Sequence, residues 1–142
     1  GLSDSVKVYA IEKNPEAVEL LYENRKKFAL TNLEIIAGTA PEALEDLPSP
    51  THVFIGGSSG KMEEVIALCL KKNPETRFVV NLITPESLAA VLEAVKTLPV
   101  TEPDLLTLTA ARSKKVGSSH LMMGQNPVWI VTFEGKICVS RM

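Results

Sequence analysis

The sequence predicts an α/β fold of three layers, in which helices cover a mostly parallel sheet that closes with a C-terminal antiparallel strand. Apolar runs of strand composition alternate with helical segments as far as Val100. Two β-rich runs then follow each other without a helix between them. The chain has 142 residues, which is enough for one domain with a buried core, so we expect a single domain over residues 1–142.

The first strand and the first helix lie close together in the sequence. Val6 to Ile11 has strand composition and is followed directly by Glu12. Asn14 can cap a helix and Pro15 is tolerated at the first helical position. Apolar side chains then recur at helical spacing as far as Phe28, which predicts a helix after the strand.

Strands and helices continue to alternate after this unit. We expect strands at Leu33–Ala37, Thr51–Ile55 and Arg77–Ile83, and helices at Pro41–Leu47, at Met62–Leu70 and from Thr84 to about Lys96.

The last part of the chain has a different pattern. Leu105 to Arg112 alternates apolar and polar residues, and Val128 to Phe133 is rich in β-formers. The connection between them contains Gly117, Gly124 and Pro127, which favour a loop. The two runs therefore predict a closing antiparallel pair, and we expect the strand at Val128–Phe133 to run antiparallel to its neighbours.

Charge, cysteine and histidine content exclude several functional classes. The net charge of −2 gives no electrostatic argument for binding nucleic acid or an anionic membrane. Cys69 and Cys138 lie in apolar contexts, which predicts buried reduced thiols, rather than a disulfide, and a cytoplasmic protein. No apolar stretch is long enough to span a bilayer, and no signal peptide is visible. His52 and His120 have no ligand residues near them in sequence, so we predict no metal site.

Glu12 is the first candidate for ligand binding. It stands at the carboxyl end of a predicted strand, where ligands bind in open α/β sheets. Its carboxylate can accept hydrogen bonds from both hydroxyls of a ribose, whereas the alternative is a surface glutamate. Lys13 and Asn14 would then lie beside an adenine edge, or they form a solvated turn.

Small residues follow the next predicted strand. Gly38, Thr39 and Ala40 would let a flat base approach the backbone and hydrogen-bond to its amides, whereas the alternative is an ordinary turn.

The run Gly56-Gly57-Ser58-Ser59-Gly60 is the glycine-rich loop of this chain. It does not match a phosphate-binding P-loop, because Ile55 stands at the first glycine position and Met62 replaces the Ser or Thr after Gly60-Lys61. We interpret the run as the floor of an active site with room for a bulky ligand. It contains no Asp, Glu, Cys or His, so it offers no obvious general base or nucleophile.

A basic cluster follows the run that begins at Leu105. Arg112, Lys114 and Lys115 form either a solvated charged loop or a site that pairs with the carboxylates of an acidic substrate. We interpret Met122-Met123 as filling the core.

Several of these segments, in this order, resemble the decarboxylating precorrin methyltransferases of cobalamin biosynthesis. The resemblance is greatest to the C15-methylating domain of precorrin-6Y C5,15-methyltransferases and covers Val6 to about Phe133. Its most specific element is Phe54-Ile55-Gly56-Gly57. The other segments that carry it are Val8–Glu16, Asn32–Glu34, Gly38–Leu44 and Asn126–Val128.

The resemblance implies a Rossmann-like fold of the class I methyltransferases, with S-adenosyl-L-methionine as cofactor, a polycarboxylated tetrapyrrole as substrate and a homo-oligomeric enzyme. It implies that Glu12 holds the ribose, that Gly38–Ala40 lie by the adenine and that Gly56-Gly57 shape the site near the methyl donor. The carbon that is methylated belongs to an electron-rich macrocycle and is itself the nucleophile, so positioning would carry catalysis.

The sequence departs from the family pattern at two places. His52 stands where an Asp is common, and no glycine-rich turn precedes Glu12. We therefore expect an N-terminally truncated domain that binds the cofactor weakly and self-associates. The alternatives are another class I methyltransferase or a non-catalytic Rossmann-like interaction domain.

Overall fold

The computed structural model describes residues 6–56 and 60–137. The chain divides into two compact units, Gly1–Leu47 and Pro48–Met142.

The first unit is a parallel β–α–β crossover. Strand β1 (Val8–Glu12) pairs in parallel with β2 (Leu33–Ala37), and helix α1 (Pro15–Lys27) connects them. The predicted start of α1 is confirmed, because Asn14 Oδ1 accepts a hydrogen bond from the Glu16 amide at 2.9 Å. The helix predicted at Pro41–Leu47 is a single 3₁₀ turn, η1 (Glu42–Leu44).

The second unit is built on a four-stranded mixed sheet in the order β3-β4-β8-β5. Three of its strands point the same way, because β8 is antiparallel to both β4 and β5 while β3 and β4 are parallel. The predicted reversal of the strand at Val128–Phe133 is therefore confirmed. The elements are β3 (His52–Gly56), α2 (Met62–Lys72), β4 (Arg77–Leu82), α3 (Pro85–Thr97), β5 (Asp104–Leu108) and β8 (Val128–Glu134).

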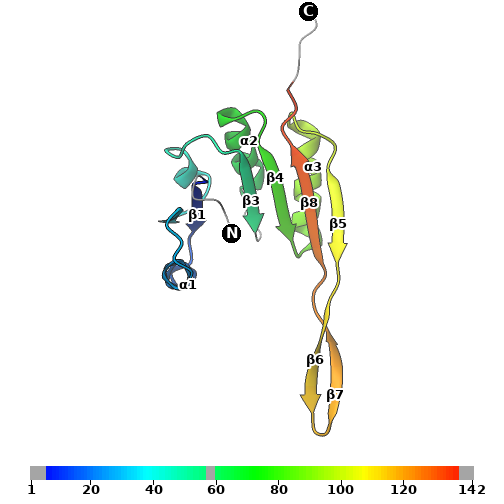
Figure 1. Cartoon of the computed structure of the whole chain (residues 1–142). Coiled ribbons are helices and arrows are strands. Elements are labelled where there is room, and N and C mark those ends of the chain that lie inside the picture. Colours follow the sequence, from blue (N-terminus) through cyan, green and yellow to red (C-terminus); the bar gives the residue numbers. More distant parts are fainter. Residues whose placement is uncertain (1–5, 57–59, 138–142) are drawn as a thin grey trace, which may run out of the picture. The chain divides into compact units, whose positions relative to one another are not determined.

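The main core lies between this sheet and its two helices. Helices α2 and α3 lie on the same side of the sheet (Figure 1). Phe78 of β4 and Phe133 of β8 stack there with ring centroids 5.1 Å apart. Side chains alternate along the strands, so the other face carries Phe54 and Val79, which are 69% and 38% exposed. Among the described residues, no helix combines the length and apolar composition that crossing a membrane requires.

The segment between β5 and β8 differs from the prediction. The run from Leu105 to Arg112 is two strands, because β5 ends at Leu108 and β6 (Ala111–Val116) begins after a short break. Strand β6 pairs with β7 (Ser119–Gly124) in a hairpin that extends away from the sheet (Figure 1). Its two-residue turn places Gly117 in the left-handed region, at φ +62°, which glycine adopts without steric cost.

Every residue of this hairpin is exposed, which overturns one interpretation. Met122 and Met123 are 67% and 46% exposed, so they do not fill the core. The reason is that, among the described elements, β6 and β7 pack mainly against each other. The basic cluster, expected in a loop or at a substrate, lies on β6.

Candidate functional site

The carboxylate of Glu12 is held at the carboxyl end of β1. Its Oε1 atom accepts a hydrogen bond from the backbone N–H of Asn14 at 3.0 Å, and no bond to Oε2 is found among the described residues. The side chain is partly exposed. One oxygen is therefore fixed and the carboxylate retains free acceptor positions, which suits a ligand that offers two hydroxyl donors.

The neighbours of Glu12 begin α1. Asn14 Oδ1 is occupied by the cap, because it accepts from the amides of Glu16 and Ala17. Lys13 is exposed. A contact of Lys13 or Asn14 with an adenine remains a prediction. Asn14 would make it through its side-chain N–H₂ group, because its backbone N–H donates to Glu12 and its carbonyl accepts from the N–H of Val18.

Gly38 brings the end of β2 against the end of β1. Its backbone N–H donates to the carbonyl oxygen of Glu12 at 3.0 Å. A Cβ on Gly38 would lie 3.4 Å from the Cβ of Ala43, in ordinary contact. Glu12 and Gly38 are thus adjacent at the carboxyl ends of β1 and β2, with Thr39 exposed beside them.

The second unit carries the other candidate residues. Gly56 ends β3 and is exposed, and a Cβ there would lie 3.2 Å from the ring of Phe54. The absence of a side chain leaves that space to the aromatic ring. Gly57, Ser58 and Ser59 lie outside the described residues.

Asn81 is a polar residue that the sequence analysis missed. It lies near the end of β4 and pairs with Gly56 on one side and Ile130 on the other. Its Oδ1 atom is buried and accepts no hydrogen bond from the residues that the structure describes. A signal was present in the sequence, because Asn81 is the one amide side chain in an otherwise apolar stretch from Phe78 to Ile83.

The basic cluster is divided between the two faces of the hairpin. Arg112 and Lys114 lie two residues apart on β6 and share a face, whereas Lys115 lies on the opposite one. Their side chains are exposed and make no ion pair among the described residues. Substrate binding by these three residues remains a prediction.

No metal centre is found within residues 6–56 and 60–137, because no three potential ligands gather there. The His52 ring lies 3.1 Å from the Thr51 hydroxyl, and His120 is exposed on β7. Cys69 is free and buried, as predicted, and burial raises the pKa of its thiol although the Lys72 charge lowers it. Cys138 lies outside the described residues.

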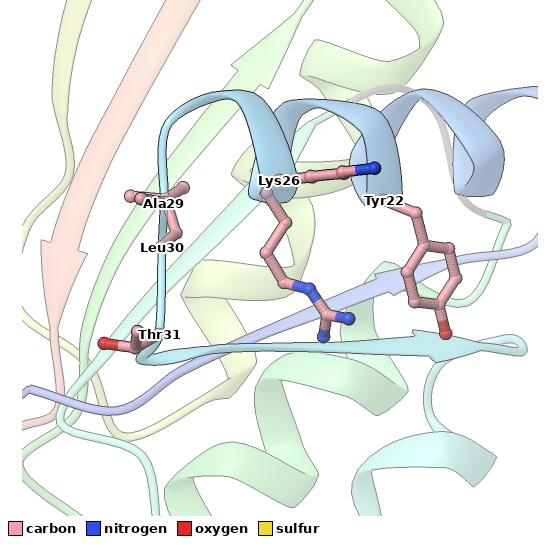
Figure 2. A pocket seen from close by; sticks show the side chains of 6 residues that line it. Tyr22, Lys26, Ala29, Leu30 and Thr31 are labelled. Carbon is pink, nitrogen blue, oxygen red and sulfur yellow. The ribbon is translucent and has the colours of Figure 1, made fainter.

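A shallow hollow lies at the C-terminal end of α1, whereas Glu12 precedes the start of this helix. Tyr22 and Lys26 point from the helix at its rim, and Ala29 to Thr31 follow the helix end (Figure 2). The Arg25 guanidinium lies over the Tyr22 ring at 5.0 Å. This contact occupies both side chains, and the residues that line the hollow include no carboxylate, thiol or imidazole.

Comparison with known proteins identifies relatives over most of this chain. The family model of the precorrin methyltransferase domain matches residues 2–134. A probable cobalt-precorrin-6B C(15)-methyltransferase (decarboxylating) from Sulfolobus acidocaldarius is 34% identical over 132 residues, which are 92% of this chain and 68% of that protein. The cobalt-precorrin-6B C(15)-methyltransferase (decarboxylating) of Salmonella typhimurium is 32% identical over 89% of this chain and 66% of its own length.

A solved structure shows the same likeness. The precorrin-6y C5,15-methyltransferase from Geobacter metallireducens superposes with a TM-score of 0.79 at 31% identity, over 90% of this chain and 68% of that one. The chain therefore spans about two thirds of the length of these relatives.

Proposed function

Because this chain belongs to the precorrin methyltransferase domain family, we propose that it is part of an enzyme that methylates C15 of cobalt-precorrin-6B and removes a carboxyl group from it. The observation that carries the proposal is the arrangement of Glu12 and Gly38. Two adjacent parallel strands end at one edge, joined there by a hydrogen bond, with a carboxylate that keeps free acceptor positions. Ligands bind at such edges in open α/β sheets.

The cofactor in this proposal is S-adenosyl-L-methionine, which supplies an electrophilic methyl group. Glu12 would hold the ribose hydroxyls through its free acceptor positions, and the small residues Gly38, Thr39 and Ala40 would admit the adenine. Gly56 would leave room near the methyl group, because it is exposed and has no side chain.

In this proposal the protein contributes to catalysis by positioning the substrate carbon against the methyl group. The attacking carbon would belong to the electron-rich tetrapyrrole, and its proton would pass to solvent once its bond to the methyl group has formed. The carboxyl group would leave as carbon dioxide, and a proton from solvent would take its place. This agrees with Gly56 and Gly60, the described ends of the glycine-rich loop, which bear no base. Arg112, Lys114 and Lys115 are exposed cations that would pair with substrate carboxylates.

We also propose that the enzyme is a homo-oligomer formed through β7. Strand β6 carries Arg112, Lys114 and Lys115, and charged edges of this kind discourage strand pairing. Strand β7 pairs only with β6 among the described strands and contains the apolar run Leu121 to Met123, without Pro, Lys or Arg. Antiparallel pairing of β7 with β7 of a second copy would bury this run and keep the like charges on the outer strands.

Methyl transfer to cobalt-precorrin-6B tests the proposed activity. The protein at its natural full length, given methyl-labelled S-adenosylmethionine and this substrate, should yield a labelled product that has lost one carboxyl group as carbon dioxide. Label on other small acceptors but not on this one would favour a different class I methyltransferase. Absence of both transfer and S-adenosylhomocysteine binding would favour a non-catalytic domain. A cytoplasmic location accompanies the proposal as a prediction.

A further inference from the structure

Asn81 has a buried polar atom whose environment is not explained by the stability of the fold. Its side-chain oxygen is inaccessible to solvent and accepts no hydrogen bond from the described residues. A buried acceptor without a donor destabilises the folded state, because it loses its hydrogen bond to water and gains none in return. An apolar side chain would avoid this cost.

The position of Asn81 links it to the candidate site of the second unit. Along β4 it lies on the same face as Val79, opposite the core residues Phe78 and Val80. In register it stands directly beside Gly56, at the carboxyl ends of two parallel strands. Helices α2 and α3 cover the other face, where the core residues lie.

The neighbours of Asn81 on this face are apolar. Ile130 is its partner on β8, Val79 precedes it by two residues, and the exposed ring of Phe54 lies one strand away. Such a surface would contact the flat, apolar body of a ligand, and the amide oxygen would add one directional polar contact to it.

We propose that Asn81 is a ligand-positioning residue, whose Oδ1 accepts a hydrogen bond from an N–H or O–H group of a ligand bound at the carboxyl end of β3 and β4. The inference rests on the proposed function for the identity of the ligand. Both the cofactor and a tetrapyrrole carry such donors, so the shared chemistry is a donor at the edge of a planar or apolar group.

Replacement by leucine gives the first test. Asn81→Leu removes the unpaired acceptor and should raise the denaturant midpoint of the apo protein. It should also lower the affinity for at least one of the two ligands about tenfold, as expected for the loss of one hydrogen bond. Calorimetry with S-adenosylhomocysteine and the KM for cobalt-precorrin-6B separate the cofactor from the substrate as the source of the donor.

Two further variants separate positioning from a general effect on the sheet. Asn81→Asp keeps an acceptor and lacks the N–H donors, so it should recover most of the lost affinity. Thr132→Val removes a hydroxyl from the adjacent strand β8, beside Val79 in register, and should leave the affinity for both ligands unchanged.

Three results would overturn the proposal. The first is an Asn81→Leu protein that is less stable than the wild type, because Asn81 would then serve the fold. The second is unchanged affinity for both ligands. The third is an Asn81→Asp protein as weak as Asn81→Leu. If the wild type fails to methylate the substrate while Asn81→Leu is more stable and loses S-adenosylhomocysteine affinity, the proposed function fails and this inference stands.

Discussion

The backbone N–H of Asn14 fixes the carboxylate of Glu12, at 3.0 Å from Oε1. The same Asn14 caps α1 with its side chain, so the start of the helix and the orientation of the carboxylate depend on one residue. A ligand that meets Glu12 therefore finds a side chain whose conformational entropy has already been reduced.

Replacement of Glu12 should weaken cofactor binding. In the protein at its natural full length, Glu12→Ala should reduce the affinity for S-adenosylhomocysteine by ~1.5–3 kcal/mol, the range for a hydrogen bond to a charged group. Calorimetry measures the dissociation constant. Glu16→Ala is the control, because Glu16 is an exposed acid on the first turn of α1. An equal effect of both changes would exclude a specific role of Glu12.

Neutralisation of the basic pair on one face of β6 should weaken substrate binding. The double variant Arg112→Ala/Lys114→Ala should raise the KM for the polycarboxylated substrate and leave kcat unchanged. Each lost exposed ion pair should weaken substrate binding by about 0.2–1 kcal/mol. The effect should shrink as salt is added. Lys96→Ala on α3 removes an exposed cation that pairs with Glu93, and serves as control. A KM that does not change would show that Arg112 and Lys114 are solvated side chains that do not bind the substrate.

A charge on the β7 edge should prevent self-association. Met122→Lys places a cation in the apolar run of β7, where it would repel a second copy and lose solvation on pairing. Light scattering should show that the oligomer becomes a monomer. Ser113→Lys is the matched control, because Ser113 is the register partner of Met122 and lies on the same face one strand away. If Met122→Lys leaves the molar mass unchanged, another surface forms the oligomer.

Gly135 should be essential for stability. A Cβ at this position would collide with the carbonyl oxygen of Pro74 and lie 2.9 Å from Cδ2 of Leu70. Gly135→Ala should lower the free energy of unfolding by about 1–3 kcal/mol, the cost of inserting atoms into a filled space. Denaturant unfolding measures it. Gly124→Ala, where a Cβ meets nothing within 4 Å, should change the stability little. Similar stabilities of the two variants would contradict the packing argument.

Cys69 should react slowly with alkylating reagents in the folded protein. Burial raises the pKa of its thiol, although the Lys72 charge lowers it. In a Cys138→Ser background, iodoacetamide should label Cys69 much faster in urea than in native buffer. Rapid native labelling would show that the thiol is accessible.

The same pKa shift has a defined effect on stability. Because the folded pKa is raised above the unfolded one, the contribution is fully present below the unfolded pKa and is lost as the pH rises through the folded pKa. The difference in unfolding midpoint between the wild type and Cys69→Ala should therefore shrink at alkaline pH. A difference that grows there would reverse the sign of the shift.

Local signals in the sequence were sufficient for the elements as far as α3, except at Pro41–Leu47, where the predicted helix is the 3₁₀ turn η1. Asn14-Pro15 and Thr84-Pro85 each placed a helix start correctly, because a cap is decided by residues adjacent in the chain. The β6–β7 hairpin was missed, since exposure on both faces leaves no regular alternation of apolar and polar residues to detect.

The candidate site could be predicted only in part. The adjacency of Glu12 and Gly38 follows from parallel pairing, which the sequence indicated. Asn81 was missed because the burial of one amide oxygen depends on neighbouring strands distant in the chain, Gly56 on one side and Ile130 on the other. The sequence predicted that the domain is single, and this remains a prediction.

The core is unevenly shared between the two units, and this has a dynamic consequence. Ile35 is the one buried apolar residue described in the first unit, and α1 has none, whereas the rest of the buried core belongs to the second unit. Backbone amides should therefore exchange with deuterium slowly in β4 and β8 and faster around Glu12. A ligand that binds at Glu12 would be detected as a slowing of exchange in a segment that has little packing of its own.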